Sequence, residues 1–330
     1  MKLLRRRLVA AGLPLSAAAT LGGWPRINIA QTGPWPSKPV TLVSPYNPGG
    51  TNDVPARLFG DGFEKLLGQR FIIRNQPGAA AIVGSKAVMA APADGYTLLS
   101  TNIGGMVVQA AAKNPPPYHP LKDFTPIVQF VQGAIFIGVN AELPVKDVGE
   151  LIALARKEPG KLTYSSAGSG SFGNLMGEYF KMLTGTDILH VPGKGSASAA
   201  LEMKAGRINL MFDPIVLPQS TDGRIRVLAV AGRERTASVP NVPTVREAGG
   251  PDMDLQGWFG LFGPAGLPSD VVTKLEQASR TVIADPETQK KFLALGISPV
   301  MLDTAAFRAR IDADYKLITE IITRAKLTID

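Results

Sequence analysis

The feature that most constrains the fold of this chain is a short apolar run followed by two consecutive glycines. Residues 40–44 are β-branched or apolar enough to form a short buried strand. Gly49 and Gly50 permit a tight turn after it, and Asn52 and Asp53 are residue types that favour a helix N-terminus. Such a junction presents backbone N–H groups and the positive end of a helix dipole. We therefore predict an anion-binding loop; a plain connecting turn, in which the glycines only save space, is the alternative.

The same order of elements recurs along the chain. Strand-like apolar runs alternate with amphipathic helical patterns, which predicts an α/β fold built on parallel sheets with helices on both faces. The further predicted strands are residues 71–74, 96–100, 162–166, 188–191, 208–212 and 226–230. The predicted helices are residues 56–67, 79–90, 148–157, 175–183, 195–204, 269–284 and 304–325, with a short helix after Pro286. Ser269 is the expected N-cap of one helix, and Asp303 or Thr304 that of the last.

Two apolar segments indicate where the chain passes between two lobes. Residues 124–139 are long enough for two strands, and residues 258–262 form a second apolar run bounded by glycines. We expect the chain to leave a first lobe in the earlier segment and to return to it in the later one. The first lobe would comprise residues 31–131 and 250–330, and the second lobe residues 132–249.

A second glycine-rich loop, residues 167–171, lies between the predicted strand 162–166 and a predicted helix. Together with the first loop it would close on one ligand. Gly168, Gly170 and Gly173 also match the G-x-G-x-x-G pattern of dinucleotide sites, but the acidic residue expected at the end of the next strand is missing. A nucleotide-binding protein, or a hydrolytic enzyme that pairs a serine of this loop with a histidine, is the alternative function.

The amino-terminal residues 1–30 have the composition of an export signal. Basic residues between Lys2 and Arg7 precede an uncharged stretch of small and apolar residues, 8–23. This stretch is too short for a convincing membrane span, and the paired arginines loosely fit a twin-arginine signal. We expect export to the periplasm by the Sec or the twin-arginine route; a retained anchor is the alternative.

Removal of this segment changes the charge of the chain. The sequence carries 35 basic and 27 acidic residues, a net charge of +8, and five of the basic residues lie in residues 1–30. The remainder has 30 basic residues against the same 27 acidic ones, a net charge of +3. The basic excess therefore gives little support to nucleic-acid binding, and we expect none.

The residue types argue against several kinds of active site. The chain has no cysteine, which excludes disulfides, thiol catalysis and cysteine-bound metals. Its two histidines are too few for a multi-histidine metal centre. We interpret His119 as a surface or packing residue and His190 as a residue packed in a buried strand. We therefore expect no catalytic residue, no metal and no cofactor.

Short motifs spread over almost the whole chain after residue 30 agree in order and spacing with one family. They include residues 35–40, 48–50, 75–78, 93–97, 190–192, 211–213, 241–244 and 264–266. On these motifs the chain resembles the Bug family, the tripartite tricarboxylate transporter receptors, also called TctC-like solute-binding proteins. The resemblance implies a type II periplasmic-binding-protein fold, with two doubly wound lobes joined by two hinge crossings.

The resemblance also implies a function. Members of this family hold a small carboxylated metabolite between the lobes and deliver it to integral membrane subunits of a tripartite transporter. We therefore expect a periplasmic solute-binding receptor that is a monomer and not an enzyme.

Site residues follow from the resemblance position by position. They fall on the two predicted loops and on the strand ends beside them. In the first lobe they are Tyr46, Gly49, Gly50, Asn52, Asp53, Ser100, Thr101 and Asn102. In the second lobe they are Ser166, Ala167, Gly170, Ser171, Asn174, Gly195 and Asp213. Two positions depart from the family pattern, because the family usually has histidine at Asn174 and an aromatic residue at Gly193.

Overall fold

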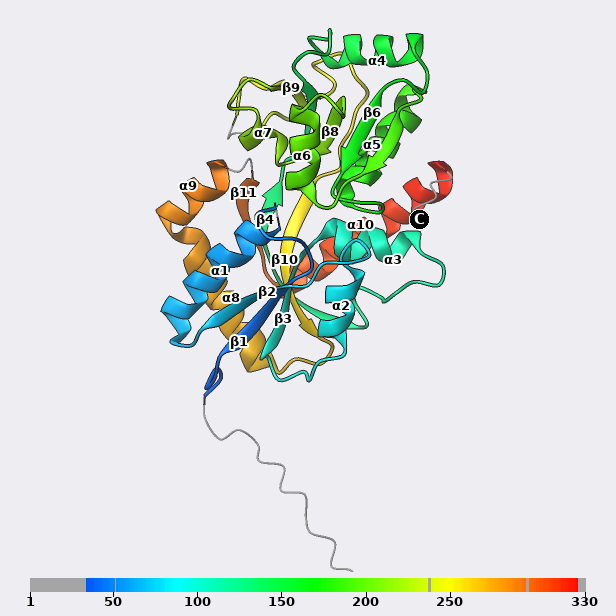
Figure 1. Ribbon diagram of the computed structural model, residues 1–330. Helices are drawn as coiled ribbons and strands as arrows, with labels where there is room; N and C mark the ends of the chain where they lie inside the picture. The colour runs from blue at the N-terminus through cyan, green and yellow to red at the C-terminus, as the bar shows by residue number, and fades with distance from the viewer. Residues whose placement is uncertain (1–33, 51, 237–238, 295–296, 326–330) are drawn as a thin grey trace, which may run out of the picture. The chain divides into compact units, whose positions relative to one another are not determined.

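Two β-sheets organise the part of the chain that the structure describes, residues 34–50, 52–236, 239–294 and 297–325 of a computed structural model (Figure 1). The predicted signal segment lies outside these residues. We call the elements around the six-stranded sheet the first lobe and those around the five-stranded sheet the second lobe. Both belong to one compact unit, Trp35–Asp330.

The first sheet has the strand order β11-β4-β10-β3-β1-β2. Strand β1 pairs in parallel with β2 and β3, whereas β10 runs antiparallel to β3 and β4, and β11 antiparallel to β4. The predicted parallel pairing is therefore confirmed for β1, β2 and β3 and wrong for the pairings of β10 and β11, which run opposite to the other four strands; β10 does so because it returns from the second lobe. The strands are β1 (Val40–Ser44), β2 (Phe71–Asn75), β3 (Thr97–Asn102), β4 (Phe124–Gly133), β10 (Gly257–Pro264) and β11 (Ile297–Leu302).

The second sheet repeats this plan with the order β7-β6-β8-β5-β9. Strand β6 is parallel to β7 and β8, and the incoming strand β5 is antiparallel to β8 and β9. The strands are β5 (Phe136–Asn140), β6 (Thr163–Ser166), β7 (Leu189–Pro192), β8 (Leu210–Asp213) and β9 (Ile225–Val230).

The chain passes between the sheets twice. It leaves the first sheet after β4 and enters the second at β5, and it returns between β9 and β10. The predicted boundary after residue 131 falls inside β4, and the predicted boundary after residue 249 falls between β9 and β10. The division into lobes at these residues stays a prediction.

Helices cover both faces of the first sheet. Leu261 of β10 belongs to a buried cluster with residues of α1 and α8, and the next residue, Phe262, belongs to a cluster with residues of α10, as expected for alternating strand residues. The helices of this lobe are α1 (Asp53–Leu67), α2 (Ile82–Met89), the π-helix η1 (Gly104–Val108), α3 (Gln109–Ala112), α8 (Ser269–Ala284), α9 (Pro286–Ala294) and α10 (Thr304–Ala325). Those of the second lobe are α4 (Val148–Lys157), α5 (Phe172–Thr184), α6 (Ser196–Lys204) and α7 (Val216–Gln219).

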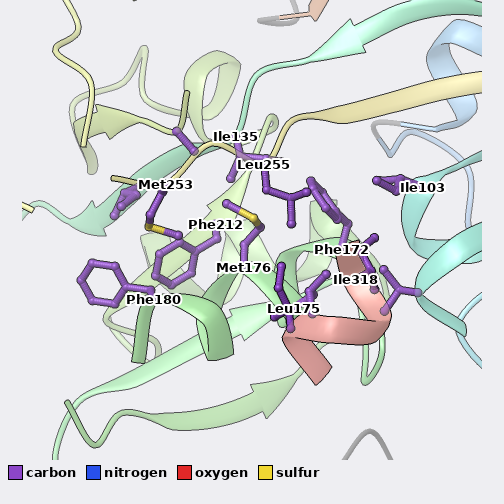
Figure 2. Close-up of a cluster of buried hydrophobic side chains, with 14 of the residues drawn as sticks. Ile103, Ile135, Phe172, Leu175, Met176, Phe180, Phe212, Met253, Leu255 and Ile318 are labelled. Atoms are coloured by element: carbon purple, nitrogen blue, oxygen red, sulfur yellow. The ribbon is translucent and has the colours of Figure 1, made fainter. Parts of the chain in front are cut away.

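The buried cluster that contains Phe262 and residues of α10 continues into the second lobe. Figure 2 shows Ile318 of α10 beside Leu175 of α5, with Met176, Phe180 and Phe212 of the second lobe in the same group. Contacts between α10 and α5 join the lobes here. The lobes are thus connected by packed side chains as well as by the two crossings.

Several helix ends differ from the predictions for local reasons. Helix α2 begins at Ile82 rather than at residue 79, because Ala79, Ala80 and Ala81 have positive φ values of 46°, 48° and 83°. Such values lie outside the right-handed helical region. The predicted N-cap Ser269 is wrong, since Pro268 holds that position and Ser269 is already helical.

Strand β7 is exposed, although the sequence predicted a buried strand. It lies at an edge of the second sheet, pairs only with β6 in the described structure, and leaves Leu189 57% exposed. His190 is only partly buried, so the interpretation of this residue as packed in a buried strand is wrong. An apolar run of four residues does not distinguish an edge strand from a central one.

Candidate functional site

A cavity of about 280 Å³ lies among the ends of strands and the starts of helices from both lobes. Of the sequence-predicted residues, those at the cavity wall are Tyr46, Gly50, Asn52, Asn102, Ala167, Ser171, Gly195 and Asp213. The others do not line it: Gly49 is exposed, and the buried ones are Asp53, Ser100, Thr101, Ser166, Gly170 and Asn174. The structure thus brings both predicted loops together at one cavity, and a second layer of predicted residues supports them.

In the first lobe, the glycine loop holds an anion of its own. The carboxylate of Asp53 accepts hydrogen bonds from the backbone N–H of Gly49 (2.9 Å) and from the side chain of Asn75 (2.7 Å). Arg57 forms an ion pair with it at 2.8 Å. Burial alone would raise the pKa of Asp53, but these hydrogen bonds and the nearby guanidinium hold it below its ordinary value. The positive end of α1 is therefore already compensated by Asp53.

The two glycines of this loop have different roles. Gly49 has a φ of 78°, a left-handed conformation that favours glycine. Gly50 does not have positive φ, but it lines the cavity, and a Cβ added there would meet only the carbonyl oxygen of Asn47 at 3.7 Å. Gly49 therefore shapes the turn, and Gly50 leaves room beside it.

Polar side chains at the end of β3 and the start of α1 are fixed by one another. The amide nitrogen of Asn52 donates to the hydroxyl of Ser44 (3.2 Å) and to the carbonyl of Ser100 (2.9 Å). Asn102 Oδ1 accepts from the Tyr46 hydroxyl and from the N–H of Gly105, both at 3.0 Å, which directs the Asn102 amide nitrogen elsewhere. Burial raises the pKa of Tyr46, so its hydroxyl stays protonated and can donate.

In the second lobe, the start of α5 carries no acidic residue in its first turn. Its N-cap is Ser171, whose hydroxyl accepts from the N–H of Asn174 at 3.3 Å. Asn174 Oδ1 in turn accepts from the N–H of Gly170 (2.9 Å), which holds the loop in place. Because the Ser171 hydroxyl acts as the acceptor in its capping bond, its proton is available to a ligand in the cavity.

The start of α6 differs, because a carboxylate lies beside it. Asp213, at the end of β8, accepts from the hydroxyl of Ser196 (2.6 Å) and from the N–H of Ile215 (2.9 Å). Three helix starts therefore surround the cavity, and two of them already have a carboxylate from the chain itself. The start of α5 has no acidic residue in its first turn, and its capping hydrogen bonds join only Gly170, Ser171 and Asn174.

Two side-chain amides of the first lobe reach across to the loops of the second. Asn47 donates to the carbonyl of Lys194 and Gln109 to the carbonyl of Gly170, each at 2.7 Å. A second cavity, of about 580 Å³, adjoins the first and shares Asn47 and Lys194 with it. The Asn47–Lys194 hydrogen bond thus lies at the boundary between the two cavities.

Apolar residues of the cavity wall were missed by the sequence reasoning. Ile103, Ile135, Phe172, Trp258 and Phe259 all line it. Their hydrophobic periodicity indicated only core positions, since a side chain that lines a cavity and one that packs in a core have the same pattern. No single-sequence signal separates the two.

A serine–histidine pair occurs, but not the one that the hydrolase alternative required. His190 Nε2 lies 2.8 Å from the hydroxyl of Ser166, and the imidazole stacks on Tyr164 with ring centres 4.7 Å apart. Burial lowers the pKa of His190 to about 4. Ser166 is fully buried and does not line the cavity. A substrate in the cavity therefore does not reach this pair.

Within the described residues, no group of three or more histidine, aspartate or glutamate side chains is placed to hold a metal ion. Nor does any helix in this part of the chain have the length and apolar character to cross a membrane.

A family match decides the relationship of the chain. The model of the tripartite tricarboxylate transporter family receptor, TctC, matches residues 55–327. The chain belongs to this family. The resemblance read from its short motifs is thereby confirmed, and members of the family are solute-binding receptors.

Solved structures of similar proteins agree with the fold of this receptor. R. palustris Rpa4515 with adipate is 32% identical, covering 89% of this chain and 99% of that one, with a TM-score of 0.84. The periplasmic binding protein BugD is 27% identical, with coverages of 88% and 99% and a TM-score of 0.83. MatC from Rhodopseudomonas palustris with bound malate is 28% identical, with coverages of 87% and 99% and a TM-score of 0.81. The predicted two-lobe periplasmic-binding-protein fold is confirmed.

Proposed function

We propose that this receptor binds one small carboxylate in the cavity between its lobes, with the carboxylate group at the start of α5. The observation that carries the proposal is the difference between the three helix starts. A carboxylate is bonded at the starts of α1 and α6, from Asp53 and Asp213, whereas the capping hydrogen bonds at the start of α5 involve only the neutral residues Gly170, Ser171 and Asn174. A helix N-terminus favours a negative charge by about 0.3–1 kcal/mol and supplies N–H donors to it.

Relatives support the ligand class. The R. palustris protein Rpa4515 holds adipate and MatC holds malate, both small carboxylates. In this chain, the donors suited to such a group are the Ser171 hydroxyl, the Asn102 amide nitrogen and backbone N–H groups of the α5 start. The anion is thus held mainly by dipoles rather than by an arginine.

The proposal includes binding without turnover. Lining residues supply hydrogen-bond donors, and neither Ser166, which is buried, nor His190, which is partly buried, lines the cavity. An enzyme would need an activated nucleophile, a base or a metal in contact with the ligand. A chromogenic ester incubated with the protein should therefore stay intact; steady release of the chromophore would contradict this part of the proposal.

Export, partner and oligomeric state complete the proposal. We infer that residues 1–30 direct the chain to the periplasm and are removed, that the receptor is a monomer, and that it serves an integral membrane transporter of the tripartite type. The composition of residues 1–30 and the family membership support this inference. Recovery of the intact chain from the cytoplasm alone, when the protein is made in its host, would contradict export.

Ser171→Ala tests the carboxylate site directly. Loss of a hydroxyl that donates to an anion should weaken binding by about 10- to 100-fold, measured by calorimetry with the best carboxylate found in a thermal-shift screen. Ser198→Ala is the matched control, because Ser198 also lines the cavity but its hydroxyl donates to the carbonyl of Gly195 at 2.9 Å. We expect the control to bind like the parent.

Two outcomes would contradict the assignment. If Ser171→Ala binds as tightly as the parent, the carboxylate does not lie at the start of α5. If no mono-, di- or tricarboxylate shifts the melting temperature, the receptor does not take this ligand class. A melting curve for each variant separates lost binding from lost folding, since removal of an N-cap costs about 1 kcal/mol.

A further inference from the structure

The cavity of about 580 Å³ beside the proposed carboxylate site is lined by residues of both lobes. We propose that it is a second anion site, which takes an oxyanion of the carboxylate or phosphate type. The oxyanion is either a second acidic group of the ligand, in which case the inference rests on the proposed function, or a separate small anion. The position of the cavity, its charged side chains and its backbone donors carry the proposal.

The two cavities have one stretch of wall in common. The residues that line both are Tyr46, Asn47, Ala167, Lys194 and Gly195. The loop of residues 167–171 lies between them, since Ser171 lines only the first cavity, and Gly168 and Ser169 line only the second. A ligand whose carboxylate lies at Ser171 is therefore next to the second cavity.

The charged side chains of the two cavities differ. Lys194 of the second lobe lines both cavities, whereas Asp213 lines only the first. The second cavity has in addition Lys113, which follows α3 in the first lobe, and no aspartate or glutamate is among the described residues that line it. Both ammonium groups therefore favour a negative group in the second cavity, and no carboxylate of its described wall opposes it.

One wall of the second cavity is a turn of unusual backbone conformation. Ala79, Ala80 and Ala81 line the cavity, and all three have positive φ. Such values are rare for residues other than glycine, and they cluster at ligand sites, where the surrounding structure imposes them. None of the three N–H groups donates a hydrogen bond to a described residue, and Ala81 is only 1% exposed. Buried N–H groups normally have an acceptor, and an oxyanion in the cavity would supply one.

These donors are not those of a helix start. Helix α2 follows the turn, and its first two N–H groups are bonded to the turn itself. That of Ile82 donates to the carbonyl of Ala79 at 3.1 Å, and that of Val83 to the carbonyl of Gly78 at 3.3 Å. The donors left for an anion therefore belong to the three alanines and to the two lysines.

Water reaches both lysines, because Lys194 is exposed and Lys113 is half-buried. Their attraction for an anion is therefore partly screened, and each should contribute about 3- to 10-fold to its affinity. This contribution should decrease as the ionic strength rises.

Calorimetry on the purified protein at constant ionic strength distinguishes the two sources of the anion. Inorganic phosphate alone probes a separate anion. Pairs of acids with equal carbon number probe a second acidic group of the ligand: butanoate with succinate, pentanoate with glutarate, and hexanoate with adipate. We expect either that phosphate binds by itself or that at least one diacid binds about tenfold more tightly than its monoacid partner.

Lys113→Gln connects this binding to the second cavity, because Lys113 does not line the first. The variant should weaken the binding of phosphate or of the preferred diacid by about 3- to 10-fold and leave that of the monoacid unchanged. Lys113→Arg, which keeps the positive charge, should bind like the parent. Lys161→Gln is the matched control, since Lys161 is an exposed lysine that lines neither cavity. A melting curve for each variant confirms folding.

The outcomes separate this inference from the proposed function. A diacid preference that Lys113→Gln removes assigns the site to a second acidic group of the ligand, and phosphate binding that it weakens assigns the site to a separate anion. If phosphate binds in this way and no carboxylic acid binds, the proposed function fails and the second anion site stands.

Three results would overturn the second anion site. In the first, the parent binds no phosphate and shows no diacid preference. In the second, Lys113→Gln binds phosphate and the diacids as tightly as the parent. In the third, Lys113→Gln and Lys161→Gln lose the same affinity. In each case, binding of the monoacids still supports the carboxylate proposal.

Discussion

Asp53 shows what a single residue type can and cannot reveal. An aspartate at the start of a helix suits both a cap and a ligand contact, and the sequence predicted a ligand contact. The structure places its carboxylate against Gly49, Arg57 and Asn75, behind the cavity. Only the contact with Asn75, which is distant in the sequence, distinguishes the two roles. The same ambiguity applies to Asn174, which supports the second loop by accepting from the N–H of Gly170.

The buried part of the His190 side chain leads to a prediction about the pH dependence of stability. Burial, with Lys181 nearby, lowers its pKa to about 4 from the ordinary value of 6.5, against the opposite effect of Glu178. Between these values the unfolded chain binds a proton and the folded chain does not, so the free energy of unfolding should fall as the pH drops from 6.5 towards 4. Urea denaturation at several pH values should show this fall in the parent and a flatter profile in His190→Gln.

His119→Gln is the control for the loss of a histidine, and it should retain the profile of the parent. Measurements above pH 4.5 avoid the range in which Asp53 begins to protonate, since the lowered pKa of that carboxyl affects stability only as the pH falls below 3.8. An unchanged pH profile in His190→Gln would show that this imidazole is not kept neutral by the fold.

Among the elements, α2 has the most unusual start. Ala79 and Ala80 precede it with φ values of 46° and 48°, a conformation that costs an alanine roughly 1 kcal/mol relative to glycine. Ala80→Gly should therefore leave stability unchanged or raise it, by up to about 1 kcal/mol. Ala309→Gly, at an exposed position within α10, should lower stability by about 1 kcal/mol. Thermal denaturation measures both changes in stability. A loss of stability in Ala80→Gly as well as in Ala309→Gly would contradict the left-handed start of α2.

Elements were predictable where a local signal marked both ends. Helix α4 was predicted with its observed bounds, because Asp147 caps it through the N–H of Glu150 and Pro159 follows it.

Two elements were missed by the sequence analysis. Strand β11 was missed because Pro299 interrupts its pattern and its pairing with β4 is irregular beyond that residue. Helix η1 was missed because Gly104 and Gly105 indicate a turn; both face tight contacts that leave no room for a side chain.

At the scale of the whole molecule, the lobes touch at the cavity and behind it. On the side of the cavity, Gln109 of the first lobe donates to the carbonyl of Gly170 of the second lobe. Behind the cavity, α10 packs against α5. We expect a ligand to favour this closed arrangement, because only there do both loops contact it. Small-angle scattering should then give a smaller radius of gyration with a saturating carboxylate than without it.

Gln109→Leu should weaken this closure, since the carbonyl of Gly170 would lose its donor in the closed state alone. Its affinity for the carboxylate should fall, by about 5- to 20-fold. Gln289→Leu is the matched control, because Gln289 donates to the carbonyl of Ile283 within the first lobe. An identical radius for free and saturated parent protein would count against closure.

The wall of Ile103, Ile135 and Phe172 has a consequence for how such a receptor can change over evolutionary time. The same atoms that meet the ligand also fill the largest buried cluster, which joins the two lobes. A mutation that reshapes the cavity for a new solute therefore also alters heat tolerance, and the two traits cannot be selected independently. A receptor that evolves to bind a new solute by substitutions in this wall must therefore pass through a less stable form, or must first acquire compensating substitutions elsewhere in the core.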